Sequence, residues 1–240
     1  MFNATSRHSF LSSWILALIL LVRFDSSTAG TITGNVRAQG KPGTEAETSG
    51  GKYDSRQFKF VERVNYEEMR DFIVYIDGPI TGKAPEQPAQ IVTARPSVAQ
   101  HKAMFEPHVL PILKGTTVEW PNNDDILHNV FSYSDAAHFD LGLYKRPYTN
   151  HVPSVTFTNA GRVDVFCSIH TRMSCVVLVL ENPWFATAND KGSYSITNVP
   201  AGTYKLKAWH ERLPTQTREV TVTDGGSVKV DFVLGPGSGL

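Results

Sequence analysis

The chain has 240 residues, of which 41% are hydrophobic and 19% charged, a composition that allows one large or two small globular domains with real cores. Its 23 basic residues match its 23 acidic residues. The positive excess that polyanion-binding proteins usually carry is therefore missing, and nucleic acid is not expected as a partner.

The first 29 residues have the layout of a secretory signal. Arg7 precedes an apolar run from Leu11 to Val22, and small residues lead up to Ala29, after which cleavage is expected. A membrane anchor is the alternative, although this run is shorter than the ~20 residues that a spanning helix needs. We therefore expect a periplasmic or secreted mature protein without stable membrane insertion.

The rest of the chain predicts an all-β fold. Short runs rich in Val, Ile, Thr, Tyr and Phe alternate with Gly, Pro and Asn clusters, as in β-sandwiches. Polar composition predicts a loop at Gln39–Gln57 and a linker at Gly82–Gln90, and Val61–Asp71 could form a short helix. The expected strands are Thr31–Ala38, Phe72–Asp77, Val109–Leu113, Thr116–Trp120, Val155–Asn159, Arg162–Cys167, Cys175–Glu181, Ser193–Thr197, Thr203–His210, Glu219–Thr223 and Ser227–Leu234.

Four side chains that can bind a metal follow one another as His128, Cys167, His170 and Met173. The last three stand at i, i+3 and i+6, so a tight loop at the end of a strand can turn all of them toward one point. Two imidazoles, one thiolate and one weak thioether are the ligands that select copper in a trigonal site with a long axial bond. The sequence therefore predicts one type 1 copper ion.

On these residues the chain resembles the cupredoxins, the blue-copper proteins that include plastocyanin, pseudoazurin and amicyanin. The resemblance covers roughly residues 90–182: Phe105–Asp124 looks like the family's opening strands, and His128-Asn-Val-Phe131 looks like its first-ligand segment. The Cys-x-x-His-x-x-Met spacing is most similar to that of amicyanin. The resemblance implies a Greek-key β-sandwich in which Met173 is the axial ligand.

The resemblance also implies supporting residues around the ligands. Asn129 occupies the position that ties the first-ligand strand to the ligand loop, and Ser168 is its expected hydrogen-bond partner. Thr171 and Arg172 depart from the family, which often has Pro and an apolar residue there. We expect the Arg172 cation to raise the reduction potential slightly or to contact an acidic partner.

Several other interpretations of these residues are open. Cys167 could form a disulfide with Cys175, although the closed loop would be short. A structural zinc site prefers four Cys or His ligands without Met, and a buried cysteine with incidental neighbours is a further possibility. Cys175 itself is expected to be a small buried hydrophobe.

A catalytic copper centre would need additional histidines in pairs. The remaining histidines downstream of the signal stand singly, and His108 and His138 are expected to be solvated loop residues. We therefore expect no enzyme activity.

Residues 183–235 resemble the carboxypeptidase regulatory-like, transthyretin-like β-sandwich, a small immunoglobulin-type fold. The similarity lies in the alternating pattern and Pro-Ala-Gly turn within Asp190–His210. This segment is short for an independent domain, and the strands within 31–81 look like its missing half. We hypothesise one discontinuous sandwich with the copper domain inserted; alternatively, the N-terminal strands extend the cupredoxin sheet.

The combined layout resembles exported proteins labelled methylamine utilisation proteins, although no residue indicates methylamine chemistry. The cupredoxin resemblance implies a protein that transfers single electrons between a protein donor and a protein acceptor, with His170 as the electron port, and we expect it to be a monomer. A copper-delivery module that is never cycled and a structural β-sandwich with accidental ligands are the alternatives.

Overall fold

The computed structural model describes residues 29–40, 65–80, 95–148 and 151–236. The signal prediction, apart from Ala29, and the Gly82–Gln90 linker lie outside these ranges, as does most of the Gln39–Gln57 loop. The described residues contain no helix with the length and apolar character needed to cross a membrane. Apart from one 3-10 turn at Tyr66–Glu68 they form strands, which confirms the all-β prediction.

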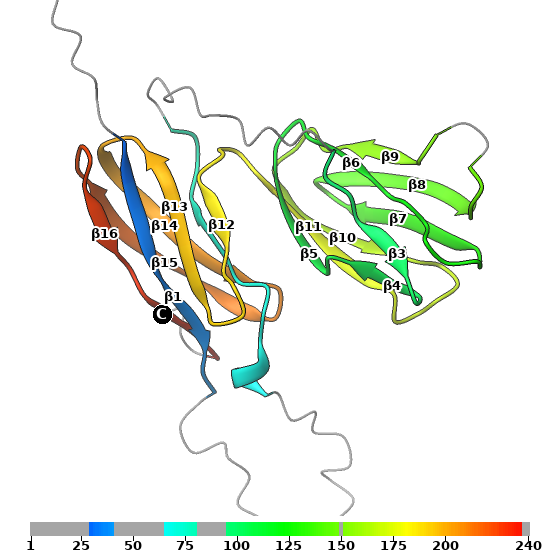
Figure 1. Ribbon diagram of the computed structural model, residues 1–240, viewed down its shortest axis with the longest axis horizontal. Helices are drawn as coiled ribbons and strands as arrows, with labels where there is room; N and C mark the ends of the chain where they lie inside the picture. The colour runs from blue at the N-terminus through cyan, green and yellow to red at the C-terminus, as the bar shows by residue number, and fades with distance from the viewer. Residues whose placement is uncertain (1–28, 41–64, 81–94, 149–150, 237–240) are drawn as a thin grey trace, which may run out of the picture.

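Two β-sandwiches lie side by side (Figure 1). We call the first the terminal sandwich, because its strands come from both ends of the described chain. One of its sheets contains β1 (Gly30–Ala38), β13 (Ser193–Val199), β16 (Ser227–Lys229) and β17 (Phe232–Leu234). The other has the order β12 (Phe185–Thr187), β2 (Ile73–Ile76), β14 (Gly202–His210) and β15 (Leu213–Val222).

The strand pairing joins the N-terminal and C-terminal segments closely. β1 pairs antiparallel with β13 and parallel with β16 and β17, while β2 lies between β12 and β14. Gly34 permits this arrangement, because a Cβ there would lie 1.8 Å from the carbonyl oxygen of Val230. The boundaries predicted for the inserted domain stay a prediction, since the linker between 80 and 95 lies outside the described residues.

The second unit, here called the central sandwich, is built from the strands between β2 and β12. Its five-stranded sheet has the order β5 (Val109–Leu113), β11 (Ser174–Leu180), β10 (Gly161–Phe166), β7 (His128–Ser134) and β8 (Ala137–Tyr144). Two further pairs are β3 (Ala99–His101) with β4 (Met104–Glu106) and β6 (Thr117–Glu119) with β9 (Ser154–Thr156). Trp120 and Phe157, both 0% exposed, are the largest fully buried side chains of its core.

β11 explains the most apolar run of the sequence. Side chains of a strand alternate between the two faces of a sheet. Cys175, Val177 and Val179 pack into the core of the central sandwich. The alternate residues Val176, Leu178 and Leu180 form a separate apolar cluster with Ile73 and Trp209 of the terminal sandwich. A strand buried on both faces reads as a continuous hydrophobic run, and here it joins the two units.

Some strand predictions need correction. The expected strands omit β7 and β8, because their alternation is interrupted by His128, Asn129 and Gly142, and they also omit the short strands β3, β4 and β12. His138 was expected on a loop but lies on β8, exposed and edge-on to Tyr133 at 4.8 Å between ring centroids. The run Ser227–Leu234 forms two strands. The break falls where the Val230 N–H donates to Thr33 O and the Asn35 N–H to the Asp231 carboxylate.

His108 is a second histidine whose environment differs from the prediction. It lies just before β5, and its two ring nitrogens contact Ser174 O at 3.2 Å and the Glu211 carboxylate at 2.9 Å. Glu211 lies in the turn between β14 and β15, so this contact bridges the two sandwiches. The hydrogen bond to Glu211 raises the pKa of His108, which is only partly solvated.

Candidate metal centre

The loop from Cys167 to Met173 connects the antiparallel strands β10 and β11. Two backbone hydrogen bonds close it: the Met173 N–H donates to His170 O at 2.9 Å, and the Cys167 N–H donates to Met173 O at 3.1 Å. A loop held in this way brings three of the sequence-predicted ligand residues to one end of the sheet.

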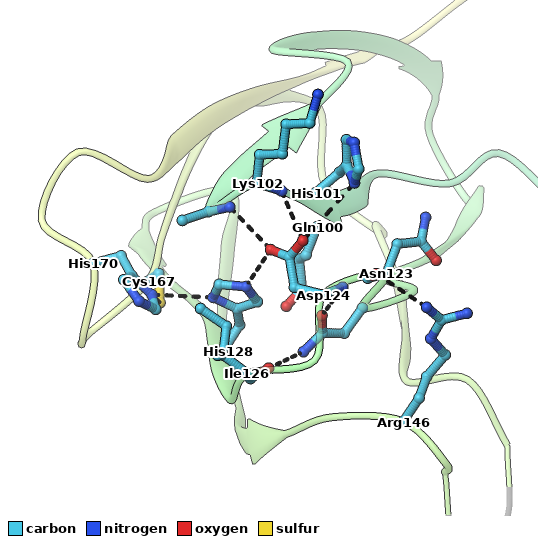
Figure 2. A network of polar contacts seen from close by, with 12 residues as sticks. Gln100, His101, Lys102, Asn123, Asp124, Ile126, His128, Arg146, Cys167 and His170 are labelled. Atoms are coloured by element: carbon cyan, nitrogen blue, oxygen red, sulfur yellow. Dashed lines mark hydrogen bonds and ion pairs between the residues drawn. The ribbon is translucent and has the colours of Figure 1, made fainter.

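The fourth predicted ligand, His128, is the first residue of β7, which pairs with β10 in the same sheet. Its Nδ1 lies 3.1 Å from His170 Nδ1, and Cys167 Sγ lies 3.6 Å from His170 Nδ1 (Figure 2). The three donor atoms all lie within 4.8 Å of one another. Atoms at this spacing can share one metal, because metal–nitrogen and metal–sulfur bonds measure roughly 2.0–2.3 Å.

Burial differs among the four residues. His128 is 0% exposed and Cys167 6% exposed, whereas His170 is half-buried. Met173 is 1% exposed and belongs to the same apolar cluster as Cys167. The centre is therefore enclosed on the His128 side and reachable by solvent at His170. The assignment of these four residues as ligands stays a prediction.

Asn129 connects β7 to the ligand loop. Its backbone N–H points at Cys167 Sγ at 3.5 Å, and its side-chain oxygen accepts the backbone N–H of Ser168 at 3.3 Å. Its amide group donates to the Asp140 carboxylate at 2.7 Å. The two predicted supporting residues are thus in contact, through the backbone of Ser168. Asp140 was not anticipated, because it follows Asn129 by eleven residues on the neighbouring strand.

Asp124 is the functional candidate that the sequence did not single out. Its Oδ2 lies 2.8 Å from His128 Nε2, and its carboxylate also accepts the backbone N–H groups of Lys102 and Ala103. Burial acts to raise the pKa of the Asp124 carboxyl, but the hydrogen bonds from Ala103, His128 and Lys102 outweigh it and lower the pKa to about 2. The carboxylate is therefore ionised at neutral pH.

The alternatives to a copper centre fit the geometry less well. Cys167 and Cys175 are both free, so they form no disulfide. Cys175 is 2% exposed and burial raises the pKa of its thiol, which keeps it protonated and unsuited to metal binding. Among the described residues, His128, Cys167 and His170 are the one group of three or more His, Cys or acidic donors that could hold a metal. A structural zinc site would need a fourth Cys, His or acidic ligand.

Two family models match segments of the two sandwiches. Residues 92–180 match the model of copper binding proteins of the plastocyanin/azurin family, and residues 176–235 match the model of the carboxypeptidase regulatory-like domain. A search of curated proteins found no match.

Three similar solved structures illustrate the likeness. An oxidized amicyanin mutant is 29% identical, with a TM-score of 0.32, over 35% of this chain and 80% of that chain. A second oxidized amicyanin mutant is 29% identical, with a TM-score of 0.33, over 38% of this chain and 87% of that chain. The copper-containing nitrite reductase from Thermus scotoductus SA-01 is 26% identical, with a TM-score of 0.33, over 38% of this chain and 23% of that chain.

The two family matches follow the two sandwiches, meeting on β11. The donor set at the end of the central sandwich is the one that copper prefers among the common protein-bound metals. The chain therefore carries a cupredoxin, a copper-binding domain of the plastocyanin/azurin family, joined to a carboxypeptidase regulatory-like β-sandwich.

Proposed function

We propose that this protein is an exported electron carrier that holds a single type 1 copper ion at His128, Cys167, His170 and Met173. The observation that carries the proposal is the convergence of two Nδ1 atoms and one Sγ atom within 4.8 Å at the end of the five-stranded sheet. A copper ion bound there would take up and release one electron.

The surrounding residues suit a carrier because they hold the donors still. The thiolate and thioether favour Cu(I), and the imidazoles accept both oxidation states. The ligand loop is closed by its own backbone hydrogen bonds and tied to β7 through Asn129. Since three of the four donors are buried, little has to move when the charge changes, and such preorganisation favours rapid transfer.

Exposed apolar side chains support a docking role for the end of the sandwich that carries His170. Ile169 precedes His170, Leu127 precedes His128, and Leu143 pairs with Asn129; they are 49%, 44% and 55% exposed. Grouped exposed apolar residues mark interaction surfaces. We infer that a redox protein docks here and exchanges an electron through the His170 ring, the half-buried member of the centre.

The decisive experiment adds Cu(II) to the purified protein and records the visible spectrum. An intense thiolate-to-copper band is expected, and Cys167→Ser should abolish it completely because serine cannot supply the sulfur donor. Cys175→Ala is the matched control: it removes a thiol that has no place in the centre and should leave the band intact. A wild-type protein without this band would sink the proposal.

Reversible reduction distinguishes a carrier from a delivery module. A carrier should pass through repeated one-electron cycles without losing copper, whereas a delivery protein should release the metal to an acceptor after reduction.

Export and oligomeric state are tested on protein isolated from its host. Its N-terminal residue should be Gly30, and its sedimentation should be that of a monomer.

A further inference from the structure

Asp124 lies between the buried histidine of the centre and a tight turn of the neighbouring hairpin (Figure 2). Its Oδ2 contacts His128 Nε2 at 2.8 Å and the Ala103 N–H at 2.9 Å, and its Oδ1 contacts the Lys102 N–H at 2.7 Å. The Asp124 side chain is 14% exposed and that of His128 0% exposed. The Asp124 carboxylate thus accepts three hydrogen bonds in a largely desolvated place, and His101 Nδ1 lies 3.8 Å from its Oδ1.

The hairpin turn depends on an outside acceptor. Lys102 and Ala103 connect β3 to β4 with φ angles of 53° and 54°. A two-residue hairpin loop with two positive φ angles prefers Asn-Gly or Gly-Gly, because other side chains are disfavoured in the left-handed region. Here the Asp124 carboxylate binds both N–H groups of the turn, so the turn and His128 are fixed by the same side chain.

The contact with His128 also decides where the imidazole proton lies. An ionised carboxylate can only accept a hydrogen bond, so His128 Nε2 must carry the proton. Neutral His128 then has its lone pair on Nδ1, the atom that lies 3.1 Å from His170 Nδ1. A carboxylate on the far nitrogen of a metal-binding histidine fixes the ring and raises its basicity.

We propose that Asp124 is a positioning residue of the copper centre: it fixes the His128 tautomer that directs Nδ1 to the metal, and its charge favours Cu(II) over Cu(I). The inference deepens the proposed function and rests on it for the identity of the metal. It goes beyond the set of ligands, because it assigns an influence on the reduction potential to a residue outside the ligand loop.

Asp124→Asn is the direct test, because it keeps the size of the side chain and removes its charge. An amide has one acceptor oxygen, so in either orientation its NH₂ group faces an N–H of the turn or the His128 nitrogen. Nitrogen NMR of the metal-free protein should show His128 as the pure Nε2–H tautomer in the wild type and as a tautomer mixture in the variant. This measurement needs no copper.

Copper affinities provide the second measurement. Loss of such a carboxylate typically weakens metal binding about 10- to 100-fold, and we expect the larger loss for Cu(II). If the variant loses tenfold more affinity for Cu(II) than for Cu(I), its one-electron reduction potential rises by about 59 mV. Asp125→Asn is the matched control, since it removes the same charge from the adjacent, exposed residue.

A variant with glycine at both turn positions separates a purely structural role of Asp124 from a role at the metal centre. Lys102→Gly with Ala103→Gly lets the turn adopt its positive φ angles without help. In that background Asp124→Asn should still mix the tautomers and shift the affinity ratio, although the fold no longer needs the carboxylate.

An unmixed tautomer together with an affinity ratio equal to that of Asp125→Asn would overturn the inference. Failure of the proposed function is recognised separately, because it appears as a wild-type protein without the thiolate-to-copper band. The tautomer measurement uses metal-free protein, so it tests the effect of Asp124 on His128 whether or not that band is seen.

Discussion

The two sandwiches share an architecture but differ in what they bury. Gln100, Asn122, His128, Asn129 and Ser132 are buried polar residues of the central sandwich, and two of them, His128 and Asn129, contact the ligand loop. The terminal sandwich buries fewer described polar residues, Asn182 and His210, beside a core of apolar and aromatic side chains. Burying polar groups is costly unless each finds a partner. Among the described residues the central sandwich bears more of that cost, part of it at the candidate metal centre, whereas the terminal sandwich contributes mainly packing.

Matched truncations in the two cores test this division most severely. Phe232 of the terminal sandwich and Phe157 of the central sandwich are 1% and 0% exposed. Each Phe→Ala change should lower the free energy of unfolding by about 3–5 kcal/mol, measured by denaturant titration. Only Phe157→Ala should also alter the copper band of the folded fraction, because Phe157 shares a cluster with Cys167 and Met173. An equal spectral change in Phe232→Ala would break the comparison.

The His108–Glu211 contact between the sandwiches predicts a moderate pH dependence of stability. The hydrogen bond to Glu211 raises the pKa of His108 above 6.5, so the stabilisation from His108 is complete below pH 6.5 and is lost as the pH rises through the raised value. The bond to His108 lowers the pKa of Glu211 below 4.5, so the stabilisation from Glu211 is complete above pH 4.5 and is lost at lower pH. The pair contributes most between these two values.

His108→Gln should remove this dependence. Because the His108 side chain is 41% exposed, we expect solvent to limit the loss at pH 5.5 to about 0.5–1 kcal/mol. Thermal melting at pH 5.5 and pH 8.5 measures it: the difference between wild type and variant should shrink at the higher pH. A constant difference across this range would show that the contact holds the sandwiches together by packing alone.

The smallest effect is expected at Arg172, which is exposed on the ligand loop. Replacing it with Gln removes a cation near the centre and should favour Cu(II) by a factor of about two to three, as expected for a screened surface charge. Redox titration of the copper-loaded protein should then show a slightly lower potential. An unchanged potential and unchanged transfer rates would remove any role for this cation.

Sequence reasoning succeeded where spacing alone carries the information. The ligand loop could be anticipated because Cys167, His170 and Met173 stand close together in the chain, and the all-β class follows from alternation over many short runs. β7 and β8 were not recognised as strands in the sequence, because the polar residues that interrupt their alternation are satisfied by partners on other strands, such as Asp140 for Asn129. Periodicity cannot reveal such partners.

Asp124 marks the limit most clearly. Asp124 and Asp125 are adjacent and chemically identical, so nothing in the sequence distinguishes them. Only the folded loop turns one carboxylate toward His128 and leaves the other exposed. The bridge between His108 and Glu211 spans 103 residues and equally depends on how the two sandwiches meet.

The double burial of β11 has a consequence for engineering. Cutting out the copper-binding half as a free-standing cupredoxin would turn a shared wall into an outer surface, with Val176, Leu178 and Leu180 facing water. Such a fragment would expose a stripe of apolar side chains on the outer face of β11, the strand that follows Met173. A soluble minimal version of this protein therefore has to be redesigned along that stripe with polar side chains, while Cys175, Val177 and Val179 on the inner face are left untouched.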